Sequence, residues 1–328
     1  MSVPFQVYIH VPYCARRCGY CDFNTYVAPA AQRAHFVAAA SREMELAALE
    51  LERRGLDGRE AQSVFLGGGT PTLLPAADLV TLLEAVRRIF GLAAGAEVTT
   101  EANPDSVDAE YLEQLAAGGF GRISIGMQSA VAPVLAALDR THAADRVEQV
   151  VSWAHRLGLA ASVDLIYGTP GESLADWERS LRAALDLEVG HISAYALTLE
   201  PHTPMARRIR AGQLGSLDPD EQATKYQLAD QLLEASGRHW YEISNWALPG
   251  QASRHNLGYW TGADWWGIGP GAHSALGGTR FWNVKHPQAY ARQLELGQLP
   301  VAGYDQPDAA GLALERLMLR LRTAQGLA

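Results

Sequence analysis

Apolar and polar positions follow two alternating patterns along the first 200 residues. Short apolar, β-branched or aromatic runs predict strands, and between them apolar side chains recur every three or four residues, as on one face of a helix. We expect strands at about residues 6–11, 63–67, 97–102, 122–128, 161–167 and 191–199. We expect helices at about residues 36–51, 79–90, 106–117, 143–157 and 172–187. This alternation is typical of an α/β protein with a parallel sheet.

Six strands joined by helical crossovers predict a partial (β/α)6 TIM-like barrel, two units short of a closed one. In such folds the functional residues lie on loops at the carboxyl ends of the strands. After about residue 200 the pattern changes, with a helix expected at 219–236 and another at 312–322. We therefore predict a barrel domain over residues 1–200 and a C-terminal extension, rich in aromatic residues, that covers the sheet edge over 201–328.

Tryptophan is concentrated in the predicted extension. Six of the eight tryptophans fall within 43 positions, namely Trp240, Trp246, Trp260, Trp265, Trp266 and Trp282. One interpretation is aromatic packing of added strands against an open sheet edge. The other is a wall for a flat, apolar ligand. The composition alone favours packing.

Composition and charge limit the class of protein. The chain has 328 residues, of which 48% are hydrophobic and 19% charged, so it can bury a large core. Its net charge of −9 offers no electrostatic footprint for nucleic acid or for an anionic membrane. No run approaches the ~20 apolar residues of a membrane span, and the first residues lack a signal-peptide pattern. We expect a cytoplasmic protein.

All three cysteines lie close together after the first predicted strand, with C-x₃-C-x₂-C spacing: Cys14, Cys18 and Cys21. Three thiolates this close predict a metal centre in a reducing compartment, and the adjacent Arg16 and Arg17 are expected to lower their pKa values. One candidate is zinc with a histidine, such as His10, as fourth ligand. The other is an iron–sulfur cluster, which usually takes four cysteines. With three, one iron would stay open to another ligand.

A glycine triplet, Gly67–Gly69, followed by Thr70, ends the second predicted strand. Glycines without a Cβ let the backbone approach a ligand closely, and its N–H and C=O groups can then bind it. A glycine triplet by itself is equally typical of a turn. Its place beside the cysteine loop favours a ligand site.

The remaining strands supply further polar residues: Glu101 and Gln128 end the third and fourth strands, Arg140 follows the fourth, and Asp164 lies within the fifth. A carboxylate at Glu101 can accept hydrogen bonds from ribose hydroxyls. Asp164 lies within an apolar run and needs a partner or a ligand if it is buried. Each residue could equally be an ordinary hydrogen-bonding group at a strand end. As a set at successive strand ends, they predict one binding site.

The cysteine loop, with Tyr20 before its last cysteine, resembles the signature of the radical SAM superfamily. The glycine motif after the second strand resembles that superfamily's second element. The resemblance implies a [4Fe-4S] cluster held by the three cysteines. It also implies S-adenosylmethionine, whose amino and carboxylate groups chelate the fourth iron.

Longer matches narrow the resemblance. The segments Tyr8–Cys14, Ser124–Ser129, Asp164–Gly171 and His255–Trp260 are similar to those of oxygen-independent coproporphyrinogen III oxidases and the related haem chaperones. The matches span about residues 8–274. They imply that S-adenosylmethionine is bound by Tyr8, Tyr20, Gly68, Gly69, Thr70, Glu101, Gln128, Arg140, Asp164 and Ala196. We assign no catalytic residue.

Three features favour the haem-chaperone branch of this group. Asp22 and Phe23 follow the last cysteine, where the oxidases carry a further cysteine in a C-x-C ending. The oxidases also have an N-terminal extension, whereas the first strand here begins within ten residues of Met1. Residues 255–260 fit the H-N-x-x-Y-W pattern of the chaperone branch, which is linked to haem binding. This implies His255 as haem ligand, with Tyr259 and nearby tryptophans, Trp260, Trp265 and Trp266, able to stack on the macrocycle.

We therefore predict a radical-SAM-type haem chaperone that binds haem, a [4Fe-4S] cluster and S-adenosylmethionine and delivers haem to an apo-haemoprotein. The enzyme alternative is an oxygen-independent coproporphyrinogen III oxidase, which converts two propionates to vinyls. A further alternative is a zinc-stabilised binding protein. Members of the group usually continue into a small C-terminal domain, which we expect to be missing from this chain.

Overall fold

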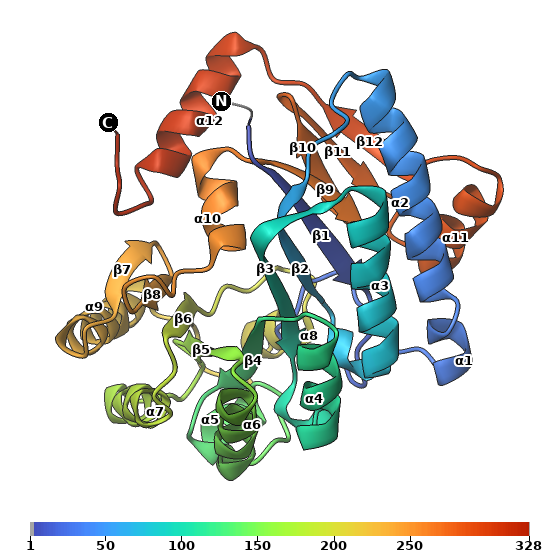
Figure 1. Cartoon of the computed structure of the whole chain (residues 1–328). Helices are drawn as coiled ribbons and strands as arrows, with labels where there is room; N and C mark the ends of the chain where they lie inside the picture. Colours follow the sequence, from blue (N-terminus) through green and yellow to red (C-terminus); the bar gives the residue numbers. More distant parts are fainter. Residues whose placement is uncertain (1–2, 328) are drawn as a thin grey trace.

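The computed structural model describes residues 3–327, through which one mixed sheet of twelve strands runs (Figure 1). Its centre is six parallel strands in chain order: β1 Phe5–Val11, β2 Ala61–Gly68, β3 Leu92–Ala102, β4 Arg122–Gln128, β5 Ala160–Tyr167 and β6 His191–Ala196. All six predicted strands are confirmed. The sheet curves as an open, partial barrel, so the predicted fold class is confirmed as well.

Helices cover the outer face of the parallel strands (Figure 1). All seven predicted helices form, namely α2 Phe36–Arg53, α3 Ala76–Ile89, α4 Ala109–Ala117, α6 Ala144–Arg156, α7 Leu174–Asp186, α9 Pro219–Ala235 and α12 Ala309–Arg320, the last of which lies away from this face. The chain also forms short helices without a sequence signal: α1 Ala30–Arg33, α5 Ala132–Ala137, α8 Pro204–Arg210, α10 Arg254–Thr261 and α11 Pro287–Glu295. These helices have four to nine residues, so each shows few apolar repeats.

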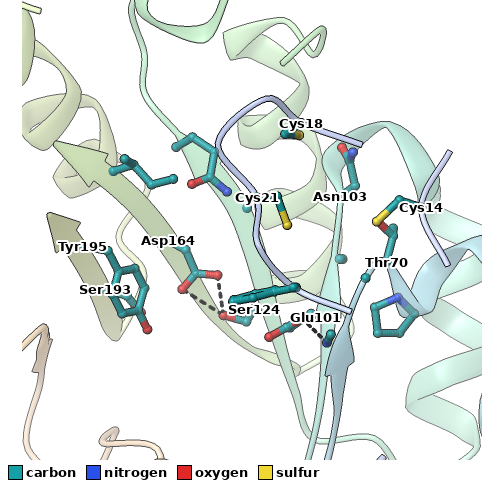
Figure 2. Close-up of a pocket in the computed structure, with 18 of the residues that line it drawn as sticks. Cys14, Cys18, Cys21, Thr70, Glu101, Asn103, Ser124, Asp164, Ser193 and Tyr195 are labelled. Atoms are coloured by element: carbon teal, nitrogen blue, oxygen red, sulfur yellow. Dashed lines mark hydrogen bonds between the residues drawn. The ribbon is translucent and has the colours of Figure 1, made fainter. Parts of the chain in front are cut away.

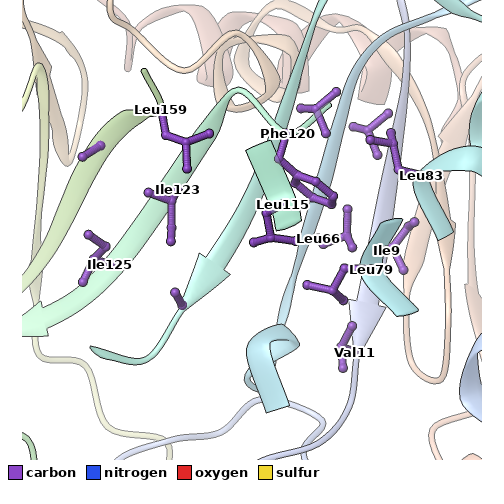
Figure 3. Packing of buried hydrophobic residues seen from close by; sticks show 14 of the residues in the cluster. Ile9, Val11, Leu66, Leu79, Leu83, Leu115, Phe120, Ile123, Ile125 and Leu159 are labelled. Atoms are coloured by element: carbon purple, nitrogen blue, oxygen red, sulfur yellow. The ribbon is translucent and has the colours of Figure 1, made fainter. Parts of the chain in front are cut away.

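The hydrophobic core lies between the sheet and these helices. Figure 3 shows Ile9 and Leu66 of the sheet facing Leu79 and Leu83 of α3, all fully buried. On the parallel strands most apolar side chains point outward to the helices and most polar ones point inward. The inward face is therefore free to line a binding site instead of a packed barrel core.

β4 illustrates this alternation. Ile123 and Ile125 belong to the hydrophobic core, whereas Arg122, Ser124 and Gln128 line the barrel interior. Side chains two residues apart point to the same face of a strand, so one strand serves both faces.

Residues after 200 add strands to both edges of this sheet. β7 His239–Glu242 and β8 Asn245–Ala247 continue antiparallel beyond β6. At the other edge β9 Asp264–Ile268 pairs in parallel with β1, and β10 His273–Leu276, β11 Thr279–Asn283 and β12 Val301–Asp305 follow antiparallel. Trp246 and Trp266 are fully buried in these additions. The packing interpretation is correct for these two rings.

α10 closes the barrel at the amino ends of β1 to β3. Gln6 of β1 donates through Nε2 to the carbonyl oxygen of His255 at 3.2 Å, and the carboxylate of Glu97 in β3 accepts from the His255 N–H at 3.0 Å. The H-N-x-x-Y-W segment thus forms the barrel floor, opposite the cysteine loop. Within the described residues, no helix has the length and apolar character needed to span a bilayer.

Candidate functional site

A cavity of about 850 Å³ extends from the carboxyl ends of the parallel strands into the barrel. This volume is typical of ligand and cofactor sites. The cavity is lined by all the residues that the sequence predicted to bind the cluster or S-adenosylmethionine, and by His255: Tyr8, Cys14, Cys18, Tyr20, Cys21, Gly68, Gly69, Thr70, Glu101, Gln128, Arg140, Asp164, Ala196 and His255. The structure brings all of them together, while their individual roles stay predictions.

The cysteine loop forms one wall of the cavity, and its three thiols are free and partly buried (Figure 2). Burial raises the pKa of Cys14 and of Cys21 above the ordinary thiol value. The effect of burial therefore exceeds the pKa lowering that was expected from Arg16 and Arg17. Arg16 points outward with its side chain 63% exposed and pairs with Asp139 at 3.2 Å. Thr70 Oγ1 donates to Cys14 Sγ at 3.8 Å, which favours the thiolate.

Three thiol donors suit iron or zinc, and the availability of a fourth protein ligand separates the two. Zinc needs four ligands about one point at ~2.0–2.3 Å. A cluster is ligated through separate irons, so its thiolates stand apart. His10, the proposed fourth zinc ligand, uses both ring nitrogens at 3.0 Å, one to the Tyr8 hydroxyl and one to the Asn24 carbonyl. The donor set fits an iron–sulfur cluster better.

The glycine motif at the end of β2 packs against the backbone of Tyr13, which precedes the cysteine loop. Gly68 adopts φ +107°, a conformation that favours glycine, and its N–H donates to the Glu101 carboxylate at 3.0 Å (Figure 2). A Cβ on Gly69 would lie 2.5 Å from the carbonyl oxygen of Tyr13. Thr70 N–H donates to that same oxygen at 2.7 Å. Only glycine allows this close approach, which leaves backbone groups next to the cavity.

Two buried carboxyl groups face the same cavity. Burial, and then the charge of Asp164, raises the pKa of Glu101 to about 7. Burial also raises the pKa of Asp164, although hydroxyl groups of Ser193 and Ser124 oppose this rise, the latter at 3.0 Å. Neither carboxylate has a basic partner within salt-bridge distance in the described chain. A ligand with a positive charge and hydroxyl groups, such as S-adenosylmethionine, therefore fits this pair.

Gln128 and Arg140 lie at the cysteine-loop end of the cavity. Gln128 adopts φ +64°, which is uncommon for a residue with a side chain and frequent at functional sites. Arg140 donates to the Gly126 carbonyl at 3.3 Å, and its buried Nε has no hydrogen-bond partner in the described structure. Ala196 ends β6 on the opposite wall.

His255 lies in the floor of the cavity and is 1% exposed. Hydrogen bonds of 2.8 Å join its Nδ1 to Ser63 Oγ and its Nε2 to the Tyr259 hydroxyl. Its ring stacks on Phe65 with centroids 5.2 Å apart. Burial lowers its pKa to about 3, so the imidazole is neutral. An iron atom could reach Nε2 only after the Tyr259 hydroxyl had moved away.

The aromatic lining of the cavity differs from the one expected. No tryptophan within residues 3–327 lines the cavity, and Trp265 instead packs edge-on against Tyr259 at 4.8 Å. The rings that do line it include Tyr8, Phe65 and Tyr259, together with others on the cysteine loop, β6 and β7. The aromatic lining of this cavity therefore consists of tyrosine, phenylalanine and histidine instead of tryptophan.

Sequence reasoning missed further polar side chains that line the cavity: Thr99, Asn103, Arg122, Ser124, Ser162, His191, Ser193, Tyr195 and Tyr241. Five of them lie an even number of positions from a predicted residue of the same strand: Thr99, Asn103, Arg122, Ser124 and Ser162. Ser124 and Arg122 precede Gln128 in steps of two, and Ser162 precedes Asp164. The period of two was therefore an available signal.

Comparison with known proteins places the chain in a family. Residues 8–184 match the profile of the radical SAM superfamily. The chain is 49% identical over 329 residues to the heme chaperone HemW of Mycobacterium tuberculosis strain H37Rv, a match that covers 99% of this chain and 83% of the relative. For the heme chaperone HemW of Bacillus subtilis strain 168 the identity is 33% over 328 residues, with 98% and 84% covered.

Among solved structures, coproporphyrinogen III oxidase (HemN) from Escherichia coli superposes with a TM-score of 0.85. The superposition covers 98% of this chain and 76% of that one at 23% identity, which establishes a shared fold. The sequence matches are closer and extend over nearly the whole chain. The chain therefore belongs to the radical SAM superfamily and, within it, to the family of the heme chaperone HemW.

Proposed function

We propose that this protein is a haem chaperone, which binds haem and delivers it to apo-haemoproteins. The observation that carries the proposal is the likeness over nearly the whole chain to relatives named heme chaperone, at 49% identity. The ending of the cysteine loop agrees, because Asp22 and Phe23 stand where the oxidase pattern has a further cysteine.

The cavity is proposed to hold two cofactors. Cys14, Cys18 and Cys21 would ligate a [4Fe-4S] cluster, whose remaining iron supplies a binding site for the amino and carboxylate groups of S-adenosylmethionine. The glycine motif would present backbone groups to the methionine part. Glu101 and Asp164 would accept hydrogen bonds from ribose hydroxyls and offset the sulfonium charge, which favours their ionised forms.

Haem is the proposed cargo, and we place it against the barrel floor at α10. Tyr8, Phe65 and Tyr259 offer ring faces there, and His255 offers a neutral imidazole. Coordination requires the Tyr259 hydroxyl to release Nε2, so haem entry and movement of this side chain are linked. The cost of breaking one such hydrogen bond is about 1 kcal/mol, which iron ligation can offset.

The compartment, the partner and the domain division complete the proposal. Three free thiols suit a reducing compartment, which supports the cytoplasm. The acceptor would be an apo-haemoprotein. We also propose the division into residues 1–200 and 201–328, supported by the end of the run of six consecutive parallel strands, β1 to β6, at Ala196.

The test begins with anaerobic reconstitution with iron and sulfide, followed by metal analysis. The cluster-loaded protein is then given haem and an apo-haemoprotein, and in parallel S-adenosylmethionine, reductant and coproporphyrinogen III. Haem transfer without loss of CO₂ from the porphyrinogen supports the chaperone. Decarboxylation at catalytic turnover would establish the oxidase instead. One zinc and no iron per chain would favour the zinc-stabilised alternative.

A further inference from the structure

The short turn between Cys18 and Cys21 is held from several sides by segments distant in sequence. Gly19 N–H donates to Asp139 Oδ2 at 2.9 Å. On the other side of the same residue, the Gly19 carbonyl oxygen accepts from Met205 N–H at 2.9 Å. The backbone of Gly19 is therefore bonded to the loop between α5 and α6 and also to α8.

The side chain that follows adds an apolar anchor. Tyr20 packs against a buried cluster separate from the main core, formed by Val131, Val134, Leu138, Ile166, Leu197 and Met205. Asp139 directly follows Leu138, a member of this cluster, and Met205 is itself a member. One compact unit therefore holds both residues that separate Cys18 from Cys21 (Figure 2 shows the two cysteines on this loop).

The close contact between Gly19 and Asp139 restricts which residues can occupy these two positions. A Cβ on Gly19 would lie 2.6 Å from Asp139 Oδ2, so a side chain there would displace the carboxylate. Asp139 itself adopts φ +54°, an unfavourable conformation for most residues that asparagine, aspartate and glycine tolerate best. Strained backbone that persists at a ligand loop is held there by its surroundings.

We propose that Asp139 is a positioning residue that, with the Met205 N–H, fixes the Gly19 peptide and thereby sets Cys18 and Cys21 in place before a cluster is bound. This inference rests on the proposed cluster site. The loop is held by hydrogen bonds and packing that need no metal. Preorganised ligands lose less conformational freedom on binding, so the cluster is retained longer.

The variants follow from the conformation of residue 139. Asp139→Gly removes the carboxylate without adding strain, because glycine accepts positive φ. Asp139→Asn keeps an oxygen acceptor for the Gly19 N–H and also tolerates this conformation. Arg16→Gln is the matched control, since it removes the exposed ion pair with Asp139 and leaves the bond to Gly19 intact.

Hydrogen exchange of the cluster-free protein directly tests whether Asp139 holds the Gly19 peptide in place. The Gly19 amide should exchange about tenfold faster in Asp139→Gly, the effect of losing one charge-assisted hydrogen bond, and should stay near the wild-type rate in the other two variants. The thermal midpoint should be nearly the same in all four proteins, which shows that the fold is intact. Equal exchange in Asp139→Gly and wild type would overturn the proposal.

The loaded protein gives the second measurement. After anaerobic reconstitution, an iron chelator should remove the cluster about tenfold faster from Asp139→Gly, with wild-type retention restored in Asp139→Asn. The electron paramagnetic resonance spectrum of the reduced cluster should shift in the glycine variant only. Equal cluster lifetimes and spectra would refute the effect on Cys18 and Cys21. If the wild-type protein took up no four-iron cluster, the proposed function would fail. The exchange data would still show whether Asp139 holds the Gly19 peptide in place.

Discussion

The proposed haem site predicts that substitutions at two neighbouring side chains, His255 and Tyr259, change haem affinity in opposite directions. His255→Ala removes the imidazole proposed to ligate haem iron and should weaken haem binding. Tyr259→Phe keeps the ring and its packing on Trp265 but removes the hydroxyl that occupies Nε2. Because the competing hydrogen bond contributes about 1 kcal/mol, its loss should tighten haem binding about fivefold.

The cost to folding must be separated from the effect on haem. His255→Ala breaks two buried 2.8 Å hydrogen bonds and leaves the Ser63 hydroxyl unpartnered beneath an empty space. Such losses amount to roughly 3 kcal/mol in the free energy of unfolding, or a fall of about 5 °C in the thermal midpoint. Tyr259→Phe should cost about 1 kcal/mol or less. Thermal unfolding of the cluster-free proteins measures both values.

Haem titration by absorbance, on folded protein well below the melting range, then gives the affinities. Iron–sulfur content should be the same in both variants, since neither side chain belongs to the cysteine loop. Because the pKa of His255 is lowered to about 3, the imidazole stays neutral, and haem binding should not fall between about pH 8 and pH 5. Unchanged affinity in His255→Ala, weaker binding in Tyr259→Phe, or a loss of haem near pH 6.5 would each refute ligation by this imidazole.

Three further predictions concern groups that hold the site in place. Glu43 is fully buried and its pKa is raised to about 7, so the folded state binds an extra proton between about pH 4.5 and 7. Stability is therefore lost as pH rises through this window, by up to about 3 kcal/mol, and Glu43→Gln should flatten the pH dependence of urea unfolding relative to wild type. Gly69→Ala forces a Cβ against backbone, so it should lower the free energy of unfolding by about 2 kcal/mol and abolish most S-adenosylmethionine binding measured by calorimetry. Gly215→Ala is the control, because its Cβ would enter open space, and it should change neither quantity. Lys225→Met leaves the Glu172 carboxylate buried and unpaired and should lower the unfolding free energy by about 3 kcal/mol, while adding Glu172→Gln should recover most of it; an equally unstable double variant would contradict this reasoning.

The parallel half of the fold was predictable because its strands carry a strong local pattern. The alternation in residues 122–128 and the apolar run in 161–167 specify strands without reference to distant residues. The added edges were not predictable in this way. β8 has three residues and β9 pairs with β1 from the far end of the chain, so their positions depend on long-range contacts. The tryptophan content indicated added strands but not which edge they would join.

The candidate site was predictable for a related reason. Strands that run in parallel end at one edge, so polar residues at successive strand ends must come together whatever the exact shape of the barrel. The environment of each group was not predictable. The raised pKa of Cys14 and the two hydrogen bonds of His255 depend on burial and on partners such as Ser63, which lies 192 residues away. Sequence spacing specifies neither.

The inward polar face also accounts for the size of the cavity. In a closed barrel, bulky branched side chains from alternate strands fill the interior in layers. Here the corresponding positions carry Ser124, Ser162 and Ser193, with Asp164 between them. Ser124 Oγ donates to the Asp164 carboxylate and accepts from Ser162 Oγ, both at 3.0 Å, and these small side chains leave space above the carboxylate. The same residues therefore satisfy the buried charge and keep the barrel hollow, and the helices on the outer face supply the apolar core that the interior lacks.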